Sequence, residues 1–142
     1  MKLRDIMTQS PVKIRPEESV AVAARMLARY NIGALPVCDG EEKLCGVVTD
    51  RDLVTRCMAS ERSVQQMRVR DVMTGRVISA APDMEIGAAA HLMGREQVRR
   101  LPVVENGKLC GMVSLGDLAS REESSGDARE ALSGISTNVS QR

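Results

Sequence analysis

The sequence repeats itself, and this repetition limits the possible folds more than any other feature. Arg-Asp-Ile-Met-Thr at residues 4–8 returns 66 positions later as Arg-Asp-Val-Met-Thr at residues 70–74. Leu-Pro-Val at residues 35–37 returns at the same spacing, at residues 101–103. A register this steady indicates two copies of one supersecondary unit.

A third match fixes the length difference between the copies. Lys-Leu-Cys-Gly occurs at residues 43–46 and 108–111, a spacing of 65, so the first copy has one extra residue in the preceding turn. Repeated units usually pack on each other because neither buries its apolar surface alone. We therefore expect repeats at residues 1–62 and 63–121, followed by a polar tail at residues 122–142.

The composition argues against several classes of protein. The formal net charge of +1 provides no general attraction to nucleic acids or membrane surfaces. Tyr30 is the sole aromatic residue, so stacking platforms for single-stranded nucleic acid are missing. Because the chain has neither a long apolar run nor the start of a secretion signal, we expect a cytoplasmic protein without nucleic-acid or membrane partners.

Metal and catalytic sites are also not indicated. The four cysteines, Cys38, Cys45, Cys57 and Cys110, have no zinc-type spacing, and His91 is the sole histidine. We interpret the cysteines as small buried thiols in a reducing cytosol. His91 has no acid and nucleophile beside it, so we predict no catalytic residue and no metal site.

The apolar periodicity and the chain breakers predict the order strand, helix, strand, strand, helix in each copy. In the first copy these elements are expected at residues 12–14, 20–30, 34–38, 44–48 and 50–58. In the second copy they are expected at residues 77–79, 85–95, 100–104, 109–113 and 115–121. The long first connection favours parallel strands, and the tight second turn favours antiparallel ones. The expected class is α/β (α+β), with two pseudo-symmetric β-α-β-β-α repeats packed sheet to sheet.

Each copy has a similar motif where its last strand becomes a helix. The motif consists of a glycine, an apolar residue, a hydroxyl and an aspartate: Gly46, Val47, Thr49 and Asp52 in the first copy, and Gly111, Met112, Ser114 and Asp117 in the second. A helix start offers free N–H groups and a positive dipole end, so with the hydroxyl it can hold a phosphate oxygen. The aspartate can accept hydrogen bonds from both ribose hydroxyls, and the glycine permits close approach.

The same pattern has an interpretation that needs no ligand. A Thr or Ser followed three residues later by an acid is also a capping box, which stabilises a helix start by itself. The occurrence of the motif twice, in the same place of a repeated unit, favours a ligand site. The two roles are compatible, because the cap can occupy an empty site.

The repeats resemble two cystathionine-β-synthase-type (CBS) domains in tandem, over residues 3–121. The resemblance rests on the Asp-(Ile/Val)-Met-Thr openings, the Leu-Pro-Val strands and the two glycine-to-aspartate motifs. It implies a disc-like pair with two clefts between the repeats that bind AMP, ADP, ATP, NAD(H) or S-adenosylmethionine. It also implies a homodimer.

The resemblance assigns roles to residues by position. Asp52 and Asp117 resemble ribose-binding acids, Thr49 and Ser114 phosphate-side hydroxyls, Val12 and Ile78 residues flanking adenine, and Ala34 and Arg100 residues lining the clefts.

The two copies differ just before their Leu-Pro-Val strands. The first copy has Gly33 and Ala34, whereas the second has Arg99 and Arg100. Because a guanidinium binds phosphate bidentately, we expect the more phosphorylated end of a ligand near Arg100. The arginine pair can equally be a solvated pair at a strand start. Arg51 can reach phosphate or remain simply solvated.

These observations favour a noncatalytic module that senses an adenosyl effector and signals to an unidentified protein partner. No catalytic cofactor is expected. A purely structural dimerisation module with empty clefts is the alternative. An enzyme is a weaker reading, because no placed base, metal set or nucleophile is evident.

Overall fold

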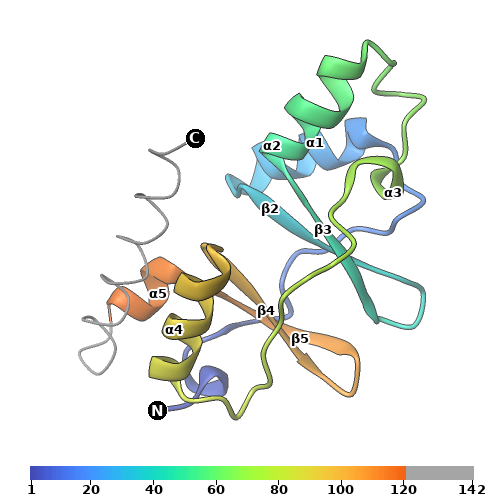
Figure 1. The fold of residues 1–142 in the computed structure, drawn as a ribbon. Coiled ribbons are helices and arrows are strands. Elements are labelled where there is room, and N and C mark those ends of the chain that lie inside the picture. Colours follow the sequence, from blue (N-terminus) through green and yellow to red (C-terminus); the bar gives the residue numbers. More distant parts are fainter. Residues whose placement is uncertain (121–142) are drawn as a thin grey trace. The chain divides into compact units, whose positions relative to one another are not determined.

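The structure is a computed structural model that describes residues 1–120 of the 142-residue chain. These residues form two compact units, which are described one at a time (Figure 1). We call Val12–Val77 the central unit, and residues 1–11 together with residues 78–120 the terminal unit. The tail expected at residues 122–142 lies outside the described residues, as does the end of the helix expected at residues 115–121.

The central unit contains one antiparallel strand pair and several helical segments. In chain order these are α1 (Val20–Tyr30), β2 (Ala34–Cys38), β3 (Leu44–Thr49), α2 (Asp50–Asp52), the π-helical turn η2 (Leu53–Cys57), the 3-10 turn η3 (Met58–Ser60) and α3 (Val69–Val72). β2 and β3 pair from Ala34 opposite Thr49 to Cys38 opposite Leu44. Ile14 forms a single parallel bridge to Val37, as the predicted crossover requires.

Helix α1 confirms the prediction for residues 20–30. The Ser19 hydroxyl accepts the N–H of Val22 at 3.2 Å, which caps the first turn. Asn31 ends the helix in the left-handed conformation, with φ of 52°. The buried positions of the helix, Val20, Ala23 and Leu27, follow the predicted three-to-four spacing.

The terminal unit contains a three-stranded sheet in the order β1-β5-β4. Its elements are η1 (Leu3–Asp5), β1 (Thr8–Gln9), α4 (Ile86–Glu96), β4 (Arg100–Glu105), β5 (Lys108–Ser114) and α5 (Leu115–Ala119). Both strand pairs are antiparallel, and Ala80 forms a single parallel bridge to Val103. The mixed helix and strand class is therefore as predicted.

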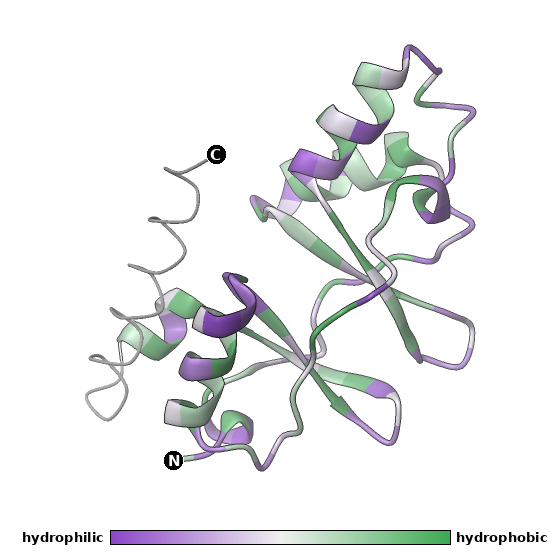
Figure 2. Cartoon of the chain, viewed as in Figure 1, coloured by the Kyte–Doolittle hydropathy of each residue, from purple (hydrophilic) through white to green (hydrophobic). Residues whose placement is uncertain are grey.

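Each unit has its own aliphatic core. Leu35, Val37 and Val48 are fully buried in the central unit, and their counterparts Leu101, Val103 and Val113 are buried in the terminal unit. Figure 2 shows mainly hydrophobic colours along the strands and hydrophilic ones at the hairpin turns. None of the helices within residues 1–120 is long and apolar enough to cross a bilayer.

The structure differs from the sequence prediction at the first strand of each repeat. Of the strand expected at residues 12–14 only Ile14 forms a bridge, and in the second repeat the bridging residue is Ala80, just after the range 77–79. The partner strands have Pro36 and Pro102 beside the bridging residues, and a proline has no N–H to donate to the preceding residues of the ladder. The helix expected at residues 50–58 is made of three short segments with different helical pitch.

The opening segment of each repeat attaches to the last strand of the other repeat, which the sequence does not predict. Thr8 lies opposite Met112 in the β1–β5 pair of the terminal unit. In the central unit, the N–H of Thr74 donates to Val47 O at 2.9 Å, and the N–H of Val47 donates to Thr74 O at 3.0 Å. Each compact unit therefore combines the body of one repeat with the opening segment of the other.

Candidate functional site

Both predicted motifs form the same closed cap at a helix start. In the central unit, Asp52 N–H donates to Thr49 Oγ1 and Thr49 N–H donates to Asp52 Oδ2, each at 3.0 Å. In the terminal unit, Ser114 and Asp117 exchange the same two hydrogen bonds, also at 3.0 Å. The capping-box interpretation is therefore correct for both motifs, and a ligand role would be additional.

Each cap leaves one carboxylate oxygen for another partner. Asp52 and Asp117 use Oδ2 in the cap, and Oδ1 of neither accepts a hydrogen bond from any residue within 1–120. An ionised carboxylate has acceptor capacity at both oxygens, so each Oδ1 can accept a ligand hydroxyl. The two acids differ in access, since Asp52 is only 8% exposed whereas Asp117 is partly exposed.

The amides at the helix starts are less available than the sequence suggests. The N–H of Asp50 donates to Gly33 O at 3.1 Å, and the N–H of Leu115 donates to Arg99 O at 2.8 Å. In the central unit, the Asp50 side chain also accepts the N–H of Arg51 at 2.7 Å. Leu115, which replaces Asp50 in the terminal unit, cannot do this. A phosphate would therefore meet fewer competing acceptors in the terminal unit.

The strand register brings the second pair of predicted residues to each cap. Ala34 lies directly opposite Thr49, and Arg100 lies directly opposite Ser114. Residues in such positions have Cβ atoms about 4.5–5.5 Å apart. Arg100 is exposed, so its guanidinium can move to an anion bound at Ser114.

The corresponding residues around the two caps carry opposite net charge. In the central unit, residues 33–34 and 49–52 include one cation and two acids, which gives −1. In the terminal unit, residues 99–100 and 114–117 include two cations and one acid, which gives +1. The residues responsible are Asp50, Arg51 and Asp52, and Arg99, Arg100 and Asp117. Over these six corresponding positions, the terminal unit has the more positive balance, which favours anions there.

The motif glycines have a structural function that the sequence analysis did not predict. A Cβ on Gly46 would lie 2.8 Å from both Met73 Sδ and Thr74 O. A Cβ on Gly111 would collide with Met7 Sδ and lie 3.1 Å from Thr8 O. The close approach of the Met-Thr opening segments therefore accounts for a glycine at both positions without a ligand.

The other predicted contact residues lie on the last strands or just before the bridging residues Ile14 and Ala80. Val12 and Ile78 are partly buried against the core of their own unit, and they precede the bridging residues by two positions. Val47 and Met112 are partly buried and pair with the Met-Thr segments.

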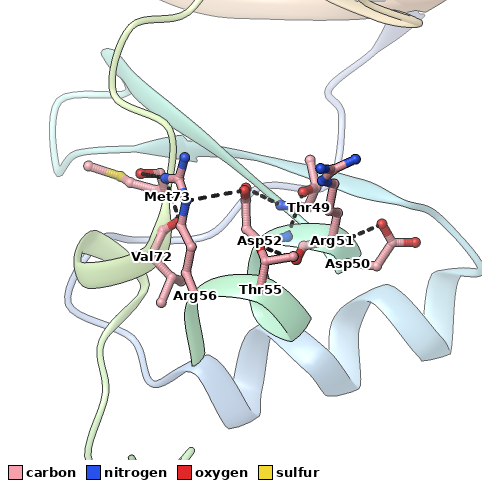
Figure 3. Close-up of polar contacts among 8 residues, drawn as sticks. All are labelled: Thr49, Asp50, Arg51, Asp52, Thr55, Arg56, Val72 and Met73. Atoms are coloured by element: carbon pink, nitrogen blue, oxygen red, sulfur yellow. Dashed lines mark hydrogen bonds and ion pairs between the residues drawn. The ribbon is translucent and has the colours of Figure 1, made fainter. Parts of the chain in front are cut away.

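Arg56 belongs to the polar network of the central cap and was not predicted. Figure 3 shows its guanidinium between the Asp52 carboxylate and the backbone of Val72 and Met73. A sequence signal for it existed, because an arginine stands four residues after the motif aspartate in both copies, at positions 56 and 121.

Cys38 and Cys57 are buried, as predicted, whereas Cys45 and Cys110 are only partly buried. Cys45 and Cys110 donate to Val37 O and Val103 O, each at 3.3 Å. Burial raises the pKa of both thiols, which keeps them protonated at neutral pH. His91 is exposed on α4, and no group of three or more metal-ligating side chains comes together within residues 1–120.

A comparison with protein families identifies the fold. The CBS domain model matches residues 3–59 and residues 69–124, which together make up most of the chain. The chain therefore belongs to the CBS domain family and carries two copies of the domain.

Known relatives share the whole module. CBS domain-containing protein YhcV of Bacillus subtilis (strain 168) is 37% identical over 134 residues, which is 94% of each protein. The CBS domain pair of protein MJ0100, in complex with 5′-methylthioadenosine and S-adenosyl-L-methionine, matches with a TM-score of 0.74 and 26% identity, over 84% of this chain and 93% of that one. The hexameric CBS-CP12 protein from bloom-forming cyanobacteria matches with a TM-score of 0.74 and 27% identity, over 87% of this chain and 72% of that one. CBS pairs of this fold thus include adenosyl-binding and oligomeric proteins.

Proposed function

We propose that this chain is a noncatalytic regulatory module that binds an adenosyl effector and signals its presence to a separate protein. The effector class comprises AMP, ADP, ATP, NAD(H) and S-adenosylmethionine. The proposal rests on one observation above all: each unit holds an aspartate whose Oδ2 closes a helix cap while Oδ1 accepts no hydrogen bond from residues 1–120.

The chemistry of that oxygen matches a ribose. A carboxylate oxygen accepts hydrogen bonds from neutral hydroxyls, and the cap fixes its direction before the ligand arrives. Val12 and Ile78 offer partly buried apolar surface for a base, while Ala34, Arg99, Arg100 and Arg51 are the flanking residues assigned to the ligand. Thr49 and Ser114 contribute through the cap, and their hydroxyls retain a proton to donate to an oxygen of the ligand.

The charge difference suggests a different preferred ligand for each unit. We propose that the terminal unit takes the more phosphorylated ligand, because Arg99 and Arg100 give its site a positive balance. The central unit, with Asp50 and Asp52 at its helix start, suits an uncharged or cationic adenosyl compound. The similarity to the MJ0100 pair, which binds S-adenosyl-L-methionine and 5′-methylthioadenosine, supports this ligand class.

The output is proposed to pass through assembly with other proteins. Val54 and Met58, 55% and 67% exposed, offer apolar surface on the helical segments that follow the central cap. Such residues suit a homodimer contact, which the family resemblance implies. The same observation favours the alternative function, a purely structural dimerisation module.

Ligand-dependent stability separates the two functions. A ligand that binds only the folded state raises the melting temperature by mass action, so at least one of AMP, ATP, NAD and S-adenosylmethionine should raise it at millimolar concentration. The double variant Asp52→Asn and Asp117→Asn should lose most of that rise. Equal melting temperatures with and without all four compounds would instead indicate the structural module. Because the chain has no Trp, adenine absorbance of the purified protein gives an independent check.

A further inference from the structure

Arg56 contacts both the central cap and a segment that is distant in sequence. Its Nη1 donates to the carbonyl oxygens of Val72 and Met73, each at 3.2 Å. Its Nε lies 3.9 Å from Asp52 Oδ1, which is an ion pair too long for a hydrogen bond. Figure 3 shows the two contacts on opposite sides of the guanidinium. One half-exposed side chain therefore joins the candidate ribose acid to residues 69–74, which we call the α3 segment.

The α3 segment packs on the core through its valines, and Arg56 binds the carbonyls at the end of its helix. Val69 and Val72 are fully buried in the central core. The last carbonyls of a helix have no partner within the helix, and a cation is favoured there. Arg56 supplies that cation. Thr74 then continues the segment onto β3 through its two hydrogen bonds with Val47.

A ligand and Arg56 can share the Asp52 carboxylate. Oδ2 is used by the Thr49 amide, whereas Oδ1 is approached only by Arg56 at 3.9 Å among the described residues. A carboxylate oxygen can accept two hydrogen bonds, so a ribose hydroxyl need not displace the guanidinium. The cap already holds Asp52, so the partner that a ligand hydroxyl at Oδ1 can restrict is the half-exposed Arg56 side chain beside it, and the two then lose less conformational freedom together than singly.

We propose that Arg56 is a positioning residue that couples ligand binding at Asp52 to the stability of the α3 segment. This inference rests on the proposed function, because it requires a ligand at Asp52. Binding at Asp52 Oδ1 restricts Arg56 beside that oxygen, and Arg56 holds the carbonyls of Val72 and Met73. Coupling is reciprocal. Loss of Arg56 must therefore weaken ligand binding by the same factor by which bound ligand stabilises the α3 segment.

Hydrogen exchange of the full chain tests the coupling, with AMP and S-adenosylmethionine as probes. The amides to follow are those of Met73 and Thr74, which donate to Val69 O and Val47 O. In the wild type, saturating probe should slow their exchange by about two- to fivefold, the size typical of a partly exposed ion pair. Arg56→Gln should abolish this slowing and weaken probe binding to the same extent. Arg25→Gln, which removes one exposed charge from α1 of the same unit, should change neither.

Two further arms distinguish coupling from a merely structural role. Added salt should reduce the slowing in the wild type, because ion pairs are screened, and should have no such effect in Arg56→Gln. Arg56→Lys keeps the charge and should recover part of the probe affinity even if Arg56→Gln is unstable.

The outcomes also separate this inference from the proposed function. Retention of the full ligand-dependent slowing in Arg56→Gln, with normal probe binding, overturns the coupling and leaves the proposed function intact. A wild-type protein that binds neither probe nor ATP nor NAD, even with both acids in place, overturns the proposed function and the coupling with it.

Discussion

The central and terminal units carry the same cap in different electrostatic surroundings. Both caps close through paired hydrogen bonds of 3.0 Å between a hydroxyl residue and an aspartate. In the central unit the aspartate is buried beside Arg56, and Asp50 adds a second acid. In the terminal unit the aspartate is partly exposed and Arg100 stands opposite the hydroxyl.

This difference shows which parts of a site are local and which come from its neighbours. The cap needs only residues three apart, so both copies form it. The charge around it depends on the adjacent strand and on the first helical turn, where the two copies have diverged. A duplicated module can thus keep one cap geometry and vary the charge around it.

The largest expected effect concerns the glycines that both units share. Gly46→Ala should lower the free energy of unfolding by about 1–3 kcal/mol, because the new Cβ meets the Thr74 carbonyl oxygen at 2.8 Å. Gly111→Ala should cost less, since the corresponding Thr8 oxygen is at 3.1 Å and the flexible Met7 side chain can move. Urea unfolding measures both.

Gly75→Ala is the control for the glycine pair, because nothing lies within 4 Å of its added Cβ. It should leave the unfolding midpoint almost unchanged. If Gly46→Ala were equally neutral, the close approach of the Met-Thr segment would not explain the motif glycine.

A moderate effect is expected at Arg100, one of the residues that make the charge of the two units different. Arg100→Ala removes a cation opposite Ser114, so ATP affinity should fall by roughly three- to tenfold while adenosine affinity stays the same. Lys108→Ala removes a cation at the other end of β5 and serves as the control. Calorimetric titration gives all of these affinities. An equal loss for ATP and adenosine would show that Arg100 does not recognise phosphate.

The smallest expected effect is a difference between the units at alkaline pH. Burial raises the pKa of the Cys38 thiol, so the folded state binds its proton more tightly than the unfolded chain does. Its contribution to stability is complete below the pKa of the unfolded thiol and is lost as the pH rises towards the folded value. Val104 occupies the corresponding place in the terminal unit.

Cys38→Val should therefore reduce the loss of stability between neutral and alkaline pH. The free energy of unfolding, measured in steps from pH 7 to pH 10.5, checks this. An unchanged pH dependence would mean that the Cys38 thiol has the same pKa in both states.

Local signals in the sequence were sufficient to predict much of the fold. Helix α1 has Ser19 before it, Asn31 after it and a regular apolar face between, and its predicted bounds agree with the structure. The hairpins follow from tight turns between apolar runs. The caps were also predictable, because a hydroxyl and an acid three residues apart need no distant partner.

Long-range contacts could not be predicted in this way. The α3 segment attaches to β3 through Thr74 and Val47, which are far apart in the chain. No motif in either segment indicates that the two pair. The same holds for Arg56, whose hydrogen bonds reach carbonyls 16 and 17 residues away. The contacts of the motif glycines with the Met-Thr segments are likewise long-range, so the sequence alone does not reveal them.

Calorimetric titration of the full chain with ATP, for the wild type and the single variants Asp52→Asn and Asp117→Asn, tests the central claim most directly. If each unit holds an adenosyl site and the terminal one prefers phosphate, Asp117→Asn should weaken the tighter binding event by roughly tenfold or more, the loss expected for a hydrogen bond to a charged group. Asp52→Asn should leave that event nearly unchanged. Identical titrations for all three proteins would contradict the assignment of these aspartates to ligand binding.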